Sequence, residues 1–158
     1  MKLFYKIALF LIICLSAFAL TGCGEKNIEG DLDELMKKVY SQLPEEKTPM
    51  GLTNIEVTAE NVEGFLGTTD IEYEEALASE SMVLSTAHSV VLVRVKDESK
   101  VKEVMAQIKE NVNPRKWVCV SVEEDQVVVK NKGNLIILIM VPEGEGAEEI
   151  EAGFDSLE

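Results

Sequence analysis

The single histidine of the chain, His88, stands among hydroxyl side chains in the segment Ser85-Thr86-Ala87-His88-Ser89. A histidine beside a serine or threonine could serve as the base of a hydrolase nucleophile. A catalytic triad also needs an orienting acid and oxyanion donors from elsewhere in the fold, and the nucleophile-elbow motif GxSxG is absent. We therefore expect His88 to lie in a surface loop, and we expect a chain without catalytic residues.

Metal-binding patterns are sparse as well. Zinc prefers several Cys or His ligands, and beyond the N-terminal segment only His88 and Cys119 are of these types. The acidic runs 70–75 and 123–125 lack the spacing of a calcium-binding EF-hand loop. We interpret them as solvated faces and expect neither a metal ion nor a dissociable cofactor.

The first 22 residues have the composition of an export signal. Lys2 and Lys6 precede an apolar run from Ile7 to Leu20, which is the order of a charged n-region and an apolar h-region. The run has 14 residues, whereas a transmembrane helix needs roughly 20. We expect residues 1–22 to be a cleaved signal peptide.

The end of this signal, Leu20-Thr21-Gly22-Cys23, has a branched apolar residue, two small residues and a cysteine. It resembles the lipobox of bacterial lipoproteins. The resemblance implies that a diacylglyceryl group is attached to the thiol of Cys23 and that the chain is cut just before it. The mature protein would then be held at the extracytoplasmic face of the cell membrane by lipid alone. The alternative is an ordinary secretory signal followed by a chance cysteine.

The sequence also predicts the roles of the other two cysteines, Cys14 and Cys119. Cys14 leaves with the signal and Cys23 would carry the lipid, so only Cys119 remains and the mature chain cannot form an internal disulfide. Cys119 lies in the apolar stretch Trp117-Val118-Cys119-Val120, which favours a buried structural thiol. A reactive thiol would need a cationic or histidine neighbour, and none is recognisable there.

The chain is strongly acidic, with 29 acidic and 15 basic side chains and a net charge of -14. Removal of the signal deletes two lysines and no acid, which leaves a net charge of -16. Such a surface repels a phosphate backbone, so nucleic acid is excluded as a partner.

One aromatic and basic cluster, Arg115-Lys116-Trp117, could contact a partner. Trp and Arg are enriched at the centres of protein interfaces. The alternative is a tryptophan at the edge of the core with cations at a helix end.

Apolar periodicity predicts an α+β fold, an antiparallel sheet of about five strands with helices packed on one face. Helical spacing follows Asp31 as N-cap and recurs after Asp97. The run LIILIMV is typical of a strand covered on both faces, and Asn131-Lys132-Gly133-Asn134 favours a hairpin turn. The expected helices are 32–43, 59–65 and 98–112, and the expected strands are 52–57, one or two within 71–84, 89–96, 117–122, 126–130 and 135–141.

We divide the chain into a signal peptide at 1–22, a flexible tether at 23–30, a single α+β domain at 31–142 and an acidic tail at 143–158. In the tail, Ile150, Phe154 and Leu157 have the spacing of a short helix that could dock, and a disordered tail is the alternative.

The lipobox, the short tether, the early amphipathic helix, the strand and helix of 89–112 and the hairpin VVVKNKGNLIILIM together resemble a family of small lipoproteins of Gram-positive anaerobes. That family is described only as a domain of unknown function. The resemblance assigns no catalytic residue, and Cys23 alone carries over as a functional position.

A lipid anchor without a catalytic constellation suggests a non-enzymatic module that binds a protein or another component of the cell envelope. The alternatives are a lipoprotein that binds a small molecule or an ion and, third, an extracytoplasmic hydrolase. An exposed apolar patch near Trp117 would favour the first, a closed apolar cavity the second, and two facing carboxylates in a cleft the third.

The anchor can be tested by itself. We expect Cys23→Ala to abolish incorporation of labelled fatty acid and to block normal processing, because the thiol that accepts the lipid is lost. A variant that still incorporates fatty acid and still fractionates with membranes would disprove the anchor at Cys23.

Overall fold

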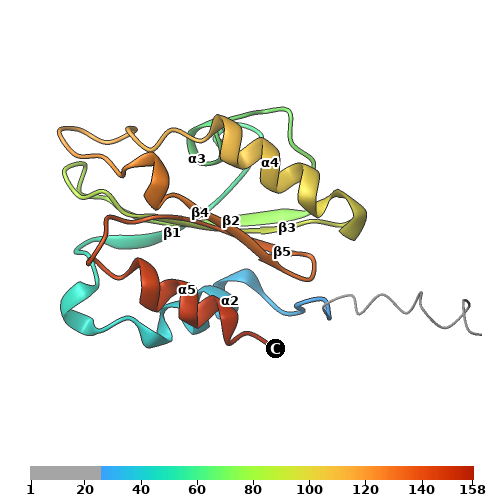
Figure 1. Cartoon of the computed structure of the whole chain (residues 1–158), viewed down its shortest axis with the longest axis horizontal. Helices are drawn as coiled ribbons and strands as arrows, with labels where there is room; N and C mark the ends of the chain where they lie inside the picture. The colour runs from blue at the N-terminus through green and yellow to red at the C-terminus, as the bar shows by residue number, and fades with distance from the viewer. Residues whose placement is uncertain (1–25) are drawn as a thin grey trace, which may run out of the picture.

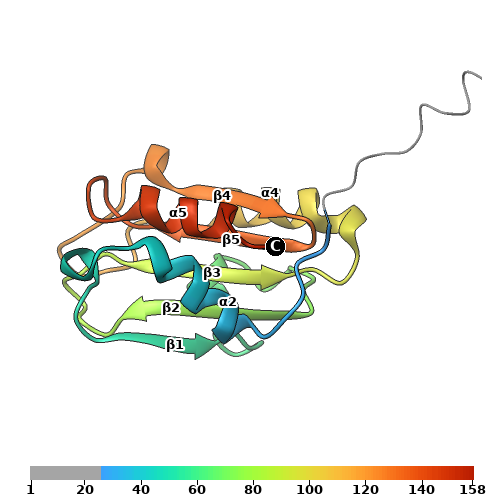
Figure 2. The same cartoon turned by 90° about the horizontal axis from the view of Figure 1, so that it is seen from below.

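The computed structural model describes residues 26–158, so the predicted signal peptide, its lipobox and Cys23 lie outside the described residues. The centre of the fold is a five-stranded sheet, which Figure 1 shows edge-on between two layers of helices. Its strand order is β1-β2-β3-β5-β4, and every neighbouring pair is antiparallel (Figure 2). The strands are β1 Leu52–Glu56, β2 Glu75–Ser81, β3 Ser89–Arg94, β4 Val128–Lys132 and β5 Leu135–Met140. The predicted α+β class and five-stranded antiparallel sheet are confirmed.

Strands β3 and β5 are buried on both faces. All six residues of β5 are buried, and successive side chains of β3 enter two different cores. Val91 and Val93 belong to one core, and Val90 and Leu92 belong to the other. The sheet must therefore be covered on each side.

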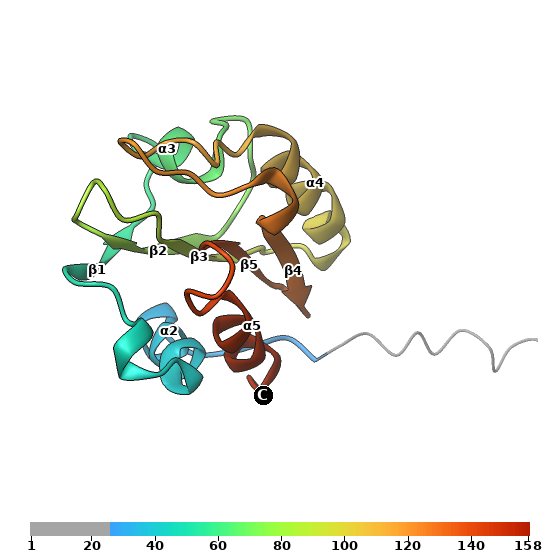
Figure 3. The ribbon, with the colours of Figure 1, turned by 60° about the vertical axis from the view of Figure 1, so that its left-hand side comes forward.

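Helices cover both faces of the sheet, whereas the sequence led us to expect one (Figure 3). Helices α3 (Val62–Leu66) and α4 (Val101–Asn111) lie on one face, and α2 (Leu32–Val39) and α5 (Ala147–Asp155) on the other. The expectation failed because the periodicity of each helix shows that one side of it is apolar, but does not show which face of the sheet it meets. No helix within residues 26–158 is long and apolar enough to cross a bilayer.

The C-terminal tail forms α5 and belongs to the domain. Ile150, Phe154 and Leu157 are buried, as the helical alternative requires. Helix α5 packs so closely on α2 that a Cβ at Gly153 would lie 2.0 Å from the carbonyl oxygen of Val39. Asp31 caps α2, as expected, by accepting from the backbone N–H groups of Asp33 and Glu34.

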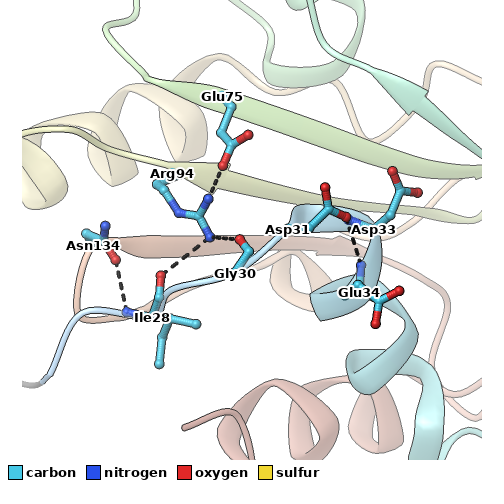
Figure 4. A network of polar contacts seen from close by, with 8 residues as sticks. All are labelled: Ile28, Gly30, Asp31, Asp33, Glu34, Glu75, Arg94 and Asn134. Atoms are coloured by element: carbon cyan, nitrogen blue, oxygen red, sulfur yellow. Dashed lines mark hydrogen bonds and ion pairs between the residues drawn. The ribbon is translucent and has the colours of Figure 1, made fainter.

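The segment before α2 is packed against the domain where a flexible tether was expected (Figure 4). Ile28 is 1% exposed, and its N–H donates to Asn134 Oδ1 at 3.1 Å. Arg94 Nη2 donates to the carbonyl oxygen of Gly30 at 2.6 Å, while Nη1 pairs with Glu75. An apolar side chain and two long-range polar contacts therefore fix residues 28–30, and none of these is visible in local composition.

The stretch 117–122 is irregular and not the strand that we predicted. Cys119 is exposed, and its φ of 64° is the only positive value at a non-glycine residue in the described part of the chain. A left-handed residue interrupts strand geometry, so alternate valines here cannot share one face of the sheet. The predicted hairpin is present: Lys132 pairs with Leu135, and Gly133 and Asn134 make the turn between them.

Four short 3₁₀ helices complete the described elements: η1 Tyr40–Gln42, η2 Glu45–Lys47, η3 Glu98–Lys100 and η4 Glu124–Gln126. The predicted helices 32–43 and 98–112 thus each divide into a 3₁₀ part and an α part.

The two ends of the sheet differ in what they carry (Figure 2). One end of the sheet holds Asn134 and Arg94, which bind Ile28 and Gly30 of the N-terminal segment, and we call it the proximal end. At the opposite, distal end, β1, β3 and β4 begin and β2 and β5 finish, as the strand registers require. The distal end therefore carries the loops 44–51, 82–88, 113–127 and 141–146.

Gly153 tests the contact between α2 and α5. We expect Gly153→Ala to lower the free energy of unfolding by about 1–3 kcal/mol, because the added Cβ forces the two helices apart. The matched control is Gly64→Ala in α3, where a Cβ has no neighbour within 4 Å. That control should be neutral or stabilising by up to about 1 kcal/mol. Urea denaturation measures both, and equal midpoints would contradict the close packing of α5.

Candidate binding surface

Five large apolar side chains are exposed at the distal end of the sheet. The exposed fractions are 81% for Met50, 64% for Met82, 37% for Val83, 68% for Leu84 and 57% for Val118. These five residues, here called the distal patch, come from three loops that follow or precede β1, β2 and α4. Exposed apolar side chains gathered at one end of a domain are typical of an interaction surface.

Backbone hydrogen bonds hold these three loops together. Met82 N donates to the carbonyl oxygen of Gly51 at 3.1 Å, and Val118 N donates to that of Leu84 at 3.1 Å. Ser81 Oγ donates to the carbonyl oxygen of Met50 at 2.9 Å. The loops that carry the distal patch are thus joined to one another, so their apolar side chains are presented as one surface.

The predicted contact cluster Arg115-Lys116-Trp117 lies beside this patch but divides into different roles. Lys116 is only 16% exposed and forms an ion pair with Glu80, which is 17% exposed. Its ammonium group also lies 5.1 Å from the centre of the Phe65 ring and 5.4 Å from that of Trp117. Burial lowers the pKa of Lys116, and the nearby Glu80 carboxylate opposes that shift. In the free domain the charge of Lys116 is therefore used in an internal ion pair.

Trp117 and Arg115 differ from Lys116. Trp117 is half-buried and packs against the core formed with α3 and α4, so it supports the loop from below. Arg115 is exposed. Of the three predicted residues, Arg115 is the one whose side chain remains free to reach a partner. Val118, which directly follows Trp117 in the chain, supplies exposed apolar surface.

A hollow of about 360 Å³ opens beside the distal patch. Its wall includes Pro49 and Thr86, which belong to the same loops as Met50 and Leu84. Two exposed acidic residues, Glu46 and Glu145, also line it, together with Lys47, whose charge is paired with Glu149. The hollow therefore combines negative charge with direct continuity to apolar surface.

His88 lies at this hollow but is buried, contrary to the expected surface position. It is 2% exposed, and its Nε2 forms a hydrogen bond of 2.9 Å with the Tyr40 hydroxyl. The two rings stack with their centres 5.9 Å apart. Burial lowers the pKa of His88 to about 4 and raises that of Tyr40 above its usual range. A neutral histidine joined to a tyrosine far away in sequence has a structural role here.

A separate groove of about 620 Å³ runs between α2 and β1. Met36, Tyr40, Leu52 and Ser79 line it. The Ser79 hydroxyl is buried beside that of Tyr40, and its oxygen makes no hydrogen bond of normal geometry within the described residues. This groove has the mixed lining of a small-molecule site, although it is open and not a closed cavity.

Neither a metal centre nor a known relative guides the assignment further. Within residues 26–158, no group of three or more His, Cys, Asp or Glu side chains is placed to hold a metal ion. No family model matches the chain, and neither the curated proteins nor the solved structures contain a significant match.

The distal-patch residues were not singled out in the sequence. Met82, Val83 and Leu84 continue the apolar pattern of β2 and were included in a predicted strand, and Val118 was assigned to another. In sequence, large apolar residues of a loop cannot be told from the buried residues of the strand before it, because the pattern does not show where the strand ends.

The buried His88 makes stability depend on pH. Its pKa is about 4 in the folded chain against 6.5 for an unperturbed histidine, so only the unfolded chain binds a proton between these values. We expect the free energy of unfolding to fall by up to about 3 kcal/mol as the pH falls from about 6.5 to about 4. His88→Gln should remove this part of the slope and leave the contribution of the carboxylates, which both chains share. Equal slopes in urea denaturation of the two chains would show that His88 is not buried in its neutral form.

Proposed function

We propose that this chain is a lipid-anchored, extracytoplasmic, non-enzymatic module that binds a protein of the cell envelope through its distal patch. The observation that carries the proposal is the position of the patch, at the end of the sheet opposite to the N-terminal segment. The lipobox-like sequence ending at Cys23 supplies the anchor in this proposal.

The anchor would hold the proximal end toward the bilayer. Cys23 precedes Ile28 by five positions, and a chain of that length spans at most about 17 Å. Several acyl chains on one cysteine, each stabilised by about 0.8 kcal/mol per buried CH₂, would make the attachment stable. The proximal end then stays near the membrane surface.

In this orientation the distal patch points away from the membrane. The strands are five to seven residues long, and at roughly 3.3 Å per residue they separate the two ends by about 20 Å. Exposed methionine, leucine and valine side chains at that position would contact another envelope component and not the bilayer that holds the anchor.

A second candidate function is the binding of a small molecule in the groove between α2 and β1. The buried Ser79 hydroxyl beside Tyr40 favours it, because a ligand could offer that hydroxyl a hydrogen bond of normal geometry. The distal patch is the stronger argument, since its five side chains are exposed to water in the free domain.

Site-specific crosslinking in cells tests the proposed function. A photoreactive phenylalanine analogue replaces Leu84 in the distal patch, and in a matched strain it replaces Lys102, which is exposed on α4. We expect irradiation to give a discrete adduct with another polypeptide from position 84 and none from position 102. An equal yield from both positions, or no adduct from either, would refute the binding role of the distal patch.

A further inference from the structure

The charges around the distal patch indicate which chemistry its partner must have. The loops of the distal end carry seven exposed carboxylates, none of which forms an ion pair within the described residues. They are Glu45, Glu46, Glu123, Glu124, Asp125, Glu143 and Glu145.

The basic residues of these loops do not neutralise the carboxylates. Lys47 is paired with Glu149 on α5, and Lys116 is paired with Glu80 on β2. Arg115 is the remaining cation of the four loops. The loops of the distal end therefore carry exposed apolar side chains together with unneutralised negative charge, whose potential extends about 8 Å into solution at physiological salt.

Two of the carboxylates belong to a shaped site and not only to an acidic surface. Glu46 and Glu145 come from loops that are far apart in sequence, and both line the hollow that also contains Pro49 and Thr86. Lys47 lines it as well, but its charge is neutralised by Glu149, so the two glutamates leave the hollow with excess negative charge. Pro49 is adjacent in the chain to Met50 of the distal patch. A side chain that enters this hollow would keep its backbone beside the apolar surface.

We propose that the distal end binds a basic amphipathic segment of its partner, with a Lys or Arg side chain in the hollow between Glu46 and Glu145 and apolar side chains on the distal patch. This inference rests on the proposed function and names the chemistry of the partner. Complementary charge at the rim of an apolar contact accelerates association and excludes partners of the wrong charge.

Other occupants of this surface fit less well. A second copy of this chain would bring the same carboxylates against each other, and like charges at an interface oppose binding. An anionic membrane surface would be repelled for the same reason. A cationic partner converts this repulsion into attraction.

The test uses the full chain in its own membrane, with the photoreactive residue at position 84 and the yield of the adduct as the readout. The test variant is Glu46→Lys with Glu145→Lys. The control variant is Glu60→Lys with Glu98→Lys, which changes the net charge equally at exposed positions of the proximal end. All four side chains are exposed and free of ion pairs within the described residues, so the fold should tolerate each change.

We expect the Glu46 and Glu145 variant to lower the adduct yield about tenfold and the control to change it less than about twofold. A further variant, Met82→Ser with Val118→Ser, should lower the yield while the charge is unchanged. Raising the salt concentration in isolated membranes should weaken the unmodified interaction.

The outcomes separate this inference from the proposed function. An adduct that persists equally in both charge variants would overturn the basic segment and leave the binding role intact. An adduct of two copies of this chain would also overturn it. Absence of any adduct from position 84 in the unmodified chain would overturn both proposals.

Discussion

Burial of β3 and β5 on both faces is the constraint on which the rest of the structure depends. These neighbouring strands place valine, leucine and isoleucine side chains on each side of the sheet, and β5 has no exposed residue. A sheet of this kind exposes apolar surface until both faces are covered, at a cost of about 25 cal/mol for each Å² left in water. Helices α2 and α5 cover one face, and α3 and α4 cover the other. The first and last helices of the described chain therefore pack against strands from its middle.

Local signals in the sequence were sufficient for most individual elements. Asp31 capped the first helix as expected, the β-branched run formed β3, and the Gly133 turn joined β4 to β5. Long-range features were not predictable in the same way. The covering of both faces depends on which elements meet in space. The packing of Ile28 and the burial of His88 depend on contacts between residues more than 45 positions apart, such as that between Tyr40 and His88. Composition and periodicity report only on near neighbours in the chain.

The candidate surface shows the same division. The aromatic and basic cluster lies in one of the loops that carry the distal patch, because Trp117 directly precedes the exposed Val118. The ion pair of Lys116 was not visible in local sequence, because its partner Glu80 lies on a strand that is distant in sequence. The predicted anchor at Cys23 rests on a short linear motif alone, so the fold of residues 26–158 does not test it.

The contacts of Ile28 and Gly30 also have a mechanical consequence. A pull on the chain before Ile28 is transmitted through Asn134 and Arg94 to β5 and β3, whereas a load on Met82 or Leu84 is borne by β2 and its loops. Opposite forces at these two places act along the strand axes. Backbone hydrogen bonds between β2 and β3 lie perpendicular to those axes and resist such shear together, not one after another. Tension between the two ends would therefore load the hydrogen bonds between β2 and β3 in shear.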